Sequence, residues 1–287
     1  MTLTDQEFRL FRNLIYEESG ILIKETRKEF LEKRVLKRIS ETGASSPYWY
    51  YRYIASMKTD ELLVLLDLMT INETSFFRNR PQIDFFNNSI LPELIKKKET
   101  GGSKTLRIWS AGCSTGEEPY SIAMGICETI AYSPNWNIKI FASDISLASL
   151  KIAKDGEYSE DKVRATVDDH LIDKYFENNG NFFRIKDEIK KLVVFDFNNL
   201  KNDNGLRNLD VIFCRNVIIY FPEDNQIKLI NRFYENLSPG GYLLLGHSES
   251  IQGWNTGFNF IHNNKGTAYK KPEETKTNED NLKGVNR

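Results

Sequence analysis

The chain has 287 residues, of which 40% are hydrophobic and 28% are charged, enough for one large or two ordinary globular domains. Its 39 basic and 40 acidic side chains nearly cancel, which argues against a protein that binds nucleic acid through a general positive field. The longest apolar runs, such as Leu62 to Leu66, span about five residues, far fewer than the roughly 20 that a membrane-crossing helix needs.

The N-terminus and the cysteine pattern indicate a cytoplasmic protein. Met1 to Glu7 has neither the basic segment nor the apolar block of a secretory signal. Cys113, Cys127 and Cys214 form no CxxC pair and are too few for a disulfide framework. Because the chain also has only three histidines, we expect no zinc site and no other metal site.

The first hundred residues predict helices. Thr4 to Glu7 has the form of a capping box, apolar residues follow at helical spacing, and Gly20 marks the expected end of that helix. Three more helices are predicted, at Lys24 to Ile39, after Ser46-Pro47, and at Asp60 to Thr70. We therefore expect an all-α N-terminal domain over residues 1–80, followed by a linker helix over residues 81–100.

The predicted helix from Lys24 to Ile39 is amphipathic. Its apolar side contains Phe30, Leu31, Val35 and Ile39. Basic residues outnumber the acidic ones on the rest of its surface; they are Lys24, Arg27, Lys28, Lys33, Arg34, Lys37 and Arg38. Such a face either docks an acidic partner or is an ordinary solvated face, and the sequence leaves both interpretations open.

After Gly101-Gly102 the pattern changes to short apolar strands that alternate with helices, which is typical of a mostly parallel α/β sheet covered on both faces. Strands are predicted at Leu106 to Ser110, Ile138 to Ser143, Leu192 to Phe195, Val211 to Cys214 and Tyr242 to Gly246. Helices are predicted at Glu118 to Tyr132, Leu147 to Lys154 and Glu223 to Leu237. We expect this domain to span residues 101–270.

Three features depart from the simple alternation. Residues 155–191 are too long for a simple connection, and Asn178 to Asn181 lies between two aromatic runs, which predicts an inserted hairpin. A terminal hairpin is predicted from Phe258 to Tyr269. Residues 271–287 lack aromatic residues and apolar periodicity, so we expect a disordered tail there.

The first predicted strand leads through a glycine turn into a helix that begins with two acids, Glu117 and Glu118. Gly112 and Gly116 allow a ligand to approach the backbone closely, and strand ends of this kind bind nucleotides in open parallel sheets. Because carboxylates repel phosphate, the two acids favour a ligand with a cationic group, such as the amino group of S-adenosylmethionine. The alternative is an ordinary turn with acids that cap a helix.

The next three strands also end in polar residues. Asp144 can accept both ribose hydroxyls of an adenosine, or can cap the helix that begins near Ser146. Asp196 to Leu200 follows the third strand, where Leu200 can cover an adenine or belong to a simple turn. Arg215 and Asn216 follow the fourth strand. Because parallel strands end at the same sheet edge, four polar ends indicate one binding crevice.

The segment from Thr70 to Asn79 joins the helical region to the run before the sheet. Its asparagine, threonine and arginine stand beside Phe76 and Phe77, which suits a lid over a bound adenosine. The alternative is a staple between domains, in which the two phenylalanines fill a core and Arg78 caps a helix.

Five segments in this order resemble the bacterial chemotaxis receptor methyltransferases, the protein-glutamate O-methyltransferases. They are Asn72 to Arg78, Ser110 to Ser121, Ala142 to Asp144, Phe213 to Val217 and Gly246 to Ser250. The resemblance covers roughly residues 5–270 and implies that S-adenosylmethionine is the cofactor. It implies cofactor contacts at Asn72, Thr74, Arg78, Glu118, Asp144, Asn199, Leu200, Arg215 and Asn216. Arg78 and Tyr220 occupy the positions that lie beside the transferable methyl group in that family.

The resemblance also implies a fold and a reaction. The fold is a Rossmann-like S-adenosylmethionine methyltransferase sheet with an inserted small antiparallel β-subdomain, preceded by an all-α N-terminal domain. The reaction is transfer of a methyl group to glutamates of the cytoplasmic domains of methyl-accepting chemotaxis receptors, which gives methyl esters and S-adenosylhomocysteine. We expect a monomer that neither binds nucleic acid nor inserts into a membrane.

Two other functions are weighed against this one. An enzyme that methylates RNA or a small molecule is disfavoured by the neutral charge and by the lack of an Asn-Pro-Pro-Tyr type motif. A non-catalytic module that senses S-adenosylmethionine is disfavoured because both Arg78 and Tyr220 are present. Consumption of the cofactor in the presence of a receptor distinguishes the enzyme from the sensor.

Overall fold

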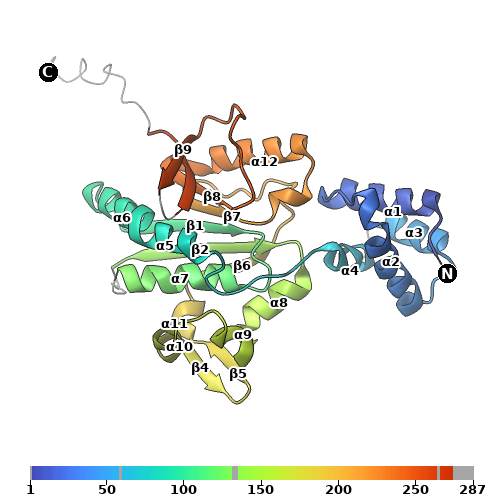
Figure 1. Cartoon of the computed structure of the whole chain (residues 1–287), viewed down its shortest axis with the longest axis horizontal. Helices are drawn as coiled ribbons and strands as arrows, with labels where there is room; N and C mark the ends of the chain where they lie inside the picture. Colours follow the sequence, from blue (N-terminus) through green and yellow to red (C-terminus); the bar gives the residue numbers. More distant parts are fainter. Residues whose placement is uncertain (1, 58–59, 131–134, 264–265, 274–287) are drawn as a thin grey trace.

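A computed structural model describes residues 2–57, 60–130, 135–263 and 266–273 (Figure 1). A helical N-terminal region lies to one side of a larger α/β region, and a small sheet projects from the α/β region (Figure 1). Most of the tail predicted at 271–287, and the end of the helix predicted to reach Tyr132, lie outside the described residues. None of the helices in the described part combines the length and apolar composition that a bilayer crossing requires.

The N-terminal region contains four α-helices: α1 (Asp5–Ser19), α2 (Lys28–Thr42), α3 (Pro47–Met57) and α4 (Asp60–Met69). The predicted capping box is confirmed, because the Thr4 and Glu7 side chains each bind the other residue's backbone amide. Gly20 caps α1 in a left-handed conformation, as expected. The helix predicted from Lys24 begins instead as a short 3₁₀ turn, η1 (Glu25–Arg27), and becomes α-helical at Lys28.

Fewer cations of the basic face of α2 are free to bind a partner than the sequence suggests. Arg38 forms an ion pair of 2.7 Å with Glu61 of α4, and Glu61 also accepts a 2.7 Å hydrogen bond from the buried Tyr50 of α3. Arg34 donates to the carbonyl of Leu68 at 2.6 Å. Lys28 forms an ion pair of 2.5 Å with Asp5 of α1. Three of the seven cations therefore join helices within the N-terminal region, because tertiary contacts supply partners that helical periodicity does not reveal.

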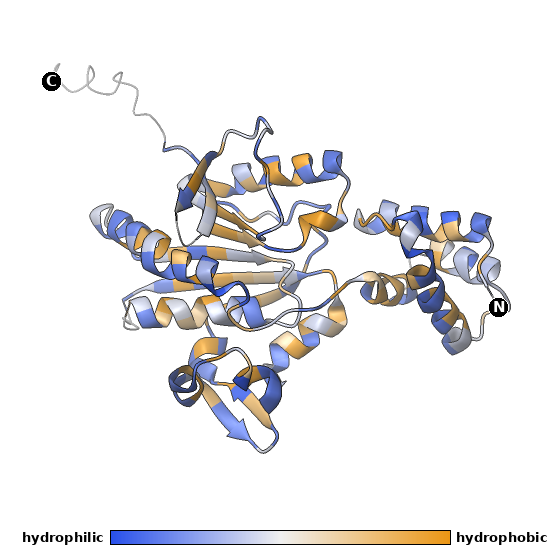
Figure 2. Ribbon diagram, viewed as in Figure 1, coloured by the Kyte–Doolittle hydropathy of each residue, from blue (hydrophilic) through white to orange (hydrophobic). Residues whose placement is uncertain are grey.

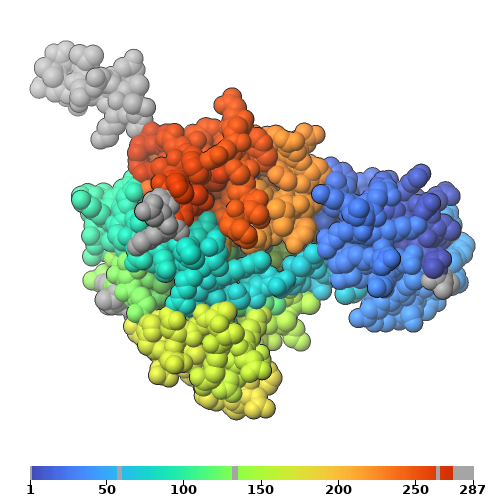
Figure 3. Space-filling view, viewed as in Figure 1, coloured from blue at the N-terminus to red at the C-terminus, as the bar shows by residue number. Residues whose placement is uncertain are grey.

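A linker crosses from the helical region to the sheet. Residues 70–79 have no regular structure, and the chain continues through α5 (Arg80–Phe85), the π-helical turn η2 (Phe86–Ile90) and α6 (Leu91–Thr100). The linker runs over the surface between the two regions, as the teal atoms in the space-filling view show (Figure 3). The single linker helix predicted over 81–100 is thus divided into three consecutive helical segments.

The main sheet has seven strands in the order β6-β2-β1-β7-β8-β10-β9. Its first five strands are parallel: β6 (Val193–Phe197), β2 (Asn137–Asp144), β1 (Thr105–Ala111), β7 (Leu209–Cys214) and β8 (Leu237–Leu245). The terminal hairpin is confirmed as β9 (Asn259–Asn263) and β10 (Gly266–Lys270), and β10 pairs antiparallel with β8. The predicted fold class is therefore confirmed.

Alternate residues of each central strand enter different cores. Ile108 of β1 packs in the cluster that contains α7 (Glu117–Thr129), whereas Trp109 packs against Phe233 of α12 (Glu223–Asn236). The apolar interior of the sheet and the polar outer faces of its helices are visible in the hydropathy colours (Figure 2). Helix α8 (Leu147–Asp155) follows β2, as predicted. Because β2, β1 and β7 are adjacent and parallel, their carboxyl ends meet at one edge of the sheet.

The insert is larger than the predicted hairpin. It contains a three-stranded antiparallel sheet of order β3-β5-β4, built from β3 (Glu157–Ser159), β4 (Phe176–Asn179) and β5 (Phe182–Ile185). Three short helices accompany it: α9 (Glu160–Arg164), α10 (Asp169–Tyr175) and α11 (Asp187–Lys190). Its apolar side, including Tyr158 and Phe176, packs on Phe76 of the linker.

Candidate functional site

A cavity opens at the carboxyl edge of the main sheet, between the sheet, the linker and the end of α1. It encloses about 1270 Å³ of empty space, a volume that includes its open mouth. All ten residues named as site candidates line it; they are Asn72, Thr74, Arg78, Glu118, Asp144, Asn199, Leu200, Arg215, Asn216 and Tyr220. Residues distant in the sequence are thus brought together at one place.

The glycine turn after β1 forms part of the cavity floor. Gly112 has φ 80°, and a Cβ added there would lie 2.5 Å from a methyl group of Val217, so no larger residue fits without a shift. Two residues later, Ser114 also has a positive φ, of 49°. Its backbone amide donates a hydrogen bond of 2.8 Å to the Asp144 carboxylate. The turn and the end of β2 are therefore fixed to each other.

Asp144 is a buried carboxylate at the end of β2. Its Oδ2 accepts from the Ser114 amide and its Oδ1 from the Ser146 amide, each at 2.8 Å. Burial nevertheless raises its pKa above the ordinary value of 3.8, although these amides act in the opposite direction. The helix cap is Ser146, whose hydroxyl accepts from Ser149, so the capping role considered for Asp144 is wrong. Each carboxylate oxygen retains capacity for a further donor from the cavity.

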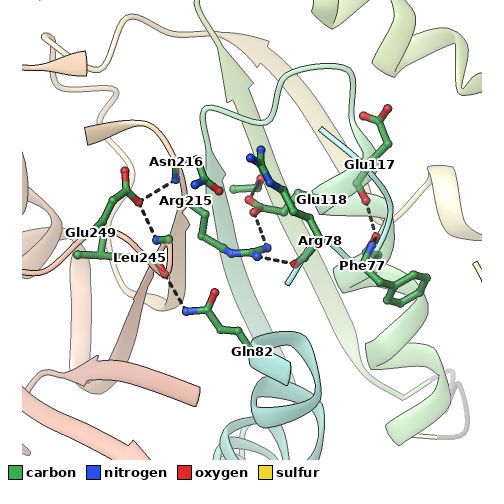
Figure 4. A network of polar contacts seen from close by, with 12 residues as sticks. Phe77, Arg78, Gln82, Glu117, Glu118, Arg215, Asn216, Leu245 and Glu249 are labelled. Carbon is green, nitrogen blue, oxygen red and sulfur yellow. Dashed lines mark hydrogen bonds and ion pairs between the residues drawn. The ribbon is translucent and has the colours of Figure 1, made fainter. Parts of the chain in front are cut away.

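Glu118 and Arg215 form an ion pair inside the cavity wall. The Glu118 carboxylate lies 3.2 Å from Arg215 and accepts a 2.7 Å bond from the Ser110 hydroxyl (Figure 4). Arg215 also donates to the backbone carbonyl of Arg78, which fastens the linker to the sheet (Figure 4). Its Nε is buried without a hydrogen-bond partner among the described residues.

The second acid of the helix start does not line the cavity. Glu117 is fully buried, accepts from the Thr115 hydroxyl, and pairs with Lys162 of α9. The idea that two acids face the ligand is therefore wrong in part, since only Glu118 does. Glu117 instead ties the insert to the turn, together with a 2.7 Å bond from the Tyr158 hydroxyl to the Thr115 carbonyl.

The linker segment packs into the main core and also lines the cavity. Phe76 and Phe77 are buried in the main core, while the backbone around them lines the cavity. Phe77 and Asn79 have φ 51° and 55°, a left-handed conformation that is strained for a bulky residue such as phenylalanine. The Phe77 amide donates to Ser121 at 2.9 Å. Arg78 lies between the two strained residues and donates to the Glu73 carbonyl at 2.7 Å, so it caps no helix.

The polar residues after β6 are partly used within the protein. Asn199 donates its side-chain amide to the carbonyl of Glu18 at 2.6 Å and accepts from the Lys201 amide. Asn199 therefore holds the end of α1, and its side chain retains one N–H and one oxygen lone pair for a ligand. Its neighbour Asn198 also lines the cavity, and the Asn198 amide nitrogen is buried without a hydrogen-bond partner among the described residues.

Tyr220 lies near the mouth of the cavity at the end of η3 (Ile218–Tyr220). Burial raises the pKa of its hydroxyl above the ordinary value of 10.0, although Arg27 and Arg78 act in the opposite direction. Its backbone carbonyl accepts a 3.0 Å bond from the Leu22 amide, which links it to the N-terminal region. The side chain is thus a neutral hydroxyl donor at neutral pH.

Several wall residues were not predicted. Ser19 is the last residue of α1, Ile21 follows the cap of that helix, and Asn198 lies in the turn after β6. No local pattern marks Ser19 or Ile21, because only the docking of the helical region on the sheet brings them to the cavity. Asn198 had a signal, since it lies in the same polar run as Asn199.

Two family models match consecutive parts of the chain. Residues 72–267 match the model described as CheR methyltransferase, SAM binding domain, where SAM is S-adenosylmethionine. Residues 6–70 match the model described as CheR methyltransferase, all-alpha domain. The two matches meet within the linker that bounds the cavity.

Proteins of three bacteria are similar over most of the chain. Chemotaxis protein methyltransferase 2 of Vibrio cholerae is 34% identical over 284 residues, which cover 97% of each chain. The chemotaxis protein methyltransferase of Borreliella burgdorferi is 36% identical over 258 residues, 88% of this chain and 91% of that one. Chemotaxis protein methyltransferase 1 of Pseudomonas aeruginosa is 31% identical over 275 residues, 94% of this chain and 99% of that one.

Proposed function

The chain belongs to the CheR methyltransferase family, and we propose that it transfers the methyl group of S-adenosylmethionine to glutamate side chains of methyl-accepting chemotaxis receptors. The products are glutamate methyl esters and S-adenosylhomocysteine. The observation that carries the proposal is the convergence of ten candidate residues on one cavity at the carboxyl edge of the sheet. The chemotaxis methyltransferase names of its relatives support the receptor as the substrate.

The cavity suits the parts of the cofactor. We assign Asp144 to the ribose hydroxyls, because its two oxygens accept one backbone amide each and retain further lone pairs. Glu118 suits the cationic amino group, and the buried Leu200 side chain in the cavity wall suits the adenine face. We propose that Asn72, Thr74, Asn199 and Asn216 complete the binding surface.

The reaction needs little help from a general base. Bound S-adenosylmethionine supplies an electrophilic methyl group on a sulfonium. A glutamate side chain, with an ordinary pKa near about 4.3, is already ionised at neutral pH and so arrives as a nucleophile. The residues of the cavity then act by orientation and by exclusion of water from that carboxylate.

We assign the acceptor carboxylate to Arg78 and Tyr220. The Tyr220 hydroxyl donates to one carboxylate oxygen and leaves the other free to attack. Arg78 orients the carboxylate or shapes the site over the cofactor, and its bond to the Glu73 carbonyl limits how fully it can pair. Full bidentate pairing would stabilise the ground state and slow the attack.

The partner surface is proposed on the N-terminal helices. Lys24, Lys33 and Lys37 remain exposed, and they suit the acidic, methylatable helices of a receptor. We retain the domain division at 1–80, 81–100 and 101–270. A separate apolar core, which runs from Leu3 to Met69, supports a distinct helical domain. The substrate places the proposed activity in the cytoplasm, and we expect a monomer that binds no nucleic acid.

The experiment that tests the enzyme against the sensor follows the cofactor. S-adenosylmethionine is incubated with the protein, with and without a receptor cytoplasmic fragment, and S-adenosylhomocysteine is quantified. We expect many equivalents of product per protein molecule, formed only when receptor is present. Binding of the cofactor without product, repeated with several receptors, would favour the sensor.

A further inference from the structure

The segment after β7 carries three candidate site residues, although little regular backbone pairing holds it. It runs from Cys214 to Tyr220 and includes Arg215 and Asn216. Asn216 has φ 59°, so the chain turns sharply where it enters the cavity wall. Backbone amides in such a turn require acceptors from elsewhere in the protein.

One carboxylate supplies those acceptors. Glu249, in the turn after β8, accepts from the Asn216 amide at 2.7 Å (Figure 4) and, through its other oxygen, from the Val217 amide at 2.8 Å. It also accepts from the Gly246 amide at 2.7 Å and, more weakly, from the Ile219 amide at 3.4 Å. Four amides from two segments therefore converge on a single side chain.

Glu249 is buried and has no cationic partner. It is only 7% exposed, and no ion pair involves it among the residues that the structure describes. A buried carboxylate is costly unless hydrogen bonds compensate for lost water, and backbone amides arranged around an anion provide that compensation. An apolar side chain would be enough to fill the space. The carboxylate therefore indicates that this position holds the backbone amides in place.

The turn that carries Glu249 is itself fixed. The Glu249 amide donates back to the Gly246 carbonyl at 2.9 Å, and the Tyr269 hydroxyl of β10 accepts from the Ile251 amide at 3.2 Å. A Cβ at Gly246 would lie 2.7 Å from the Glu249 carboxylate and 2.8 Å from the Asn216 nitrogen. The glycine therefore gives the carboxylate room to reach both segments.

We propose that Glu249 is a positioning residue of the methyl-transfer site, which acts through the Cys214 to Tyr220 segment. It does not line the cavity. Its carboxylate holds Asn216 against the region where the cofactor binds. It also fixes the position of Tyr220 relative to that region. The inference rests on the proposed function, and it adds a residue whose side chain touches neither substrate nor cofactor.

The test replaces the carboxylate and keeps its size. Glu249→Gln places a carboxamide NH₂, which can only donate, against backbone amides that also donate, so the segment should shift. We expect kcat for receptor methylation to fall about tenfold or more and the Kd of S-adenosylhomocysteine to rise, whereas Glu249→Asp retains part of the activity. Glu223→Gln, on the exposed start of α12, is the matched control and should behave as the wild type.

A double-mutant cycle separates positioning from general structure. Because Glu249 acts through Tyr220, the kcat loss from Glu249→Gln should be clearly smaller in a Tyr220→Phe background than in the wild type. Losses that multiply independently, or a Glu249→Gln kcat within about twofold of the wild type, would overturn the proposal. If the glutamine variant does not fold, the cycle is run with Glu249→Asp. An inactive wild type would instead contradict the proposed function.

Discussion

At the scale of single residues, Asp144 meets two opposing demands. Its carboxylate is buried, which favours the protonated form, yet it accepts two backbone amides, which favours the ionised form. Burial dominates and raises the pKa above 3.8. A raised pKa means that the proton stabilises the folded protein. This contribution is complete below the unfolded pKa and is lost as the pH rises through the folded pKa.

Cofactor affinity should have the opposite pH dependence, because ribose hydroxyls donate to the ionised form of Asp144. We predict that S-adenosylhomocysteine binds more weakly as the pH falls through the raised pKa, in a window above 3.8. Asp144→Asn should weaken binding about tenfold to a hundredfold at neutral pH, since a hydrogen bond to a charged group contributes about 1.5–3 kcal/mol. Titration calorimetry measures both, and equal affinities of variant and wild type would remove Asp144 from the site.

Tyr220 offers a different readout, because its proposed partner is the acceptor and not the cofactor. Tyr220→Phe should lower kcat about tenfold to a hundredfold, as loss of one positioned donor does, and leave the Kd of S-adenosylhomocysteine unchanged. Tyr234→Phe is a matched control, since Tyr234 lies on α12 outside the cavity wall. A Tyr220→Phe variant with normal kcat would exclude the hydroxyl from catalysis.

At the scale of elements, the insert is joined to the cofactor turn by a charge. Lys162 of α9 pairs with Glu117, which is fully buried at the start of α7. Removing only the lysine leaves a buried carboxylate without its cation. We predict that Lys162→Met lowers the free energy of unfolding by about 2–3 kcal/mol, measured by denaturant titration, somewhat less than for a fully buried pair because Lys162 is partly exposed.

Two further variants make that prediction specific. Adding Glu117→Gln to Lys162→Met should restore most of the lost stability, because the buried charge is then gone. Lys174→Met removes a cation from the surface pair with Glu128 and should cost less than about 1 kcal/mol. Equal losses for the two lysine variants would show that Glu117 does not need Lys162.

The cations of the N-terminal helices differ in role, since Arg38 stabilises the region whereas Lys33 and Lys37 are exposed. Arg38→Glu should destabilise this region by about 3–5 kcal/mol, because it places a carboxylate against Glu61 and Glu41. Lys33→Glu and Lys37→Glu change exposed positions and should alter stability by less than about 0.5 kcal/mol. If the basic face docks the receptor, the lysine variants methylate it more slowly but bind S-adenosylhomocysteine normally. Unchanged methylation would reject the docking role.

At the scale of the whole molecule, the cavity exists because the helical N-terminal region and the α/β region both contribute to its wall. Asn199 holds the end of α1 through the Glu18 carbonyl, and the Leu22 amide donates to the Tyr220 carbonyl on the other side. Ser19 and Ile21 thereby become part of the wall. We therefore expect binding of the cofactor to depend on the helical region as well as on the sheet.

The sequence predicts the parts of this arrangement that local chemistry determines. Strand ends with polar residues, such as Asp144 and Arg215, indicate the cavity because parallel strands end together. The partners of Arg38, Glu117 and Asn199 could not be predicted, because Glu61, Lys162 and Glu18 are distant in the sequence and meet only in the fold. The proposed role of Glu249 cannot be predicted for the same reason, although Glu249 lies in one of the five segments that carry the family resemblance.

The measurement that tests the account most directly identifies the product. Labelled methyl from S-adenosylmethionine is supplied to the protein with a receptor cytoplasmic fragment, and the labelled receptor is treated with mild base. The account predicts label that is released as methanol and that disappears when the acceptor glutamates are replaced by alanine. Label that survives base, or that remains on the alanine-substituted receptor, would contradict methyl transfer to glutamate.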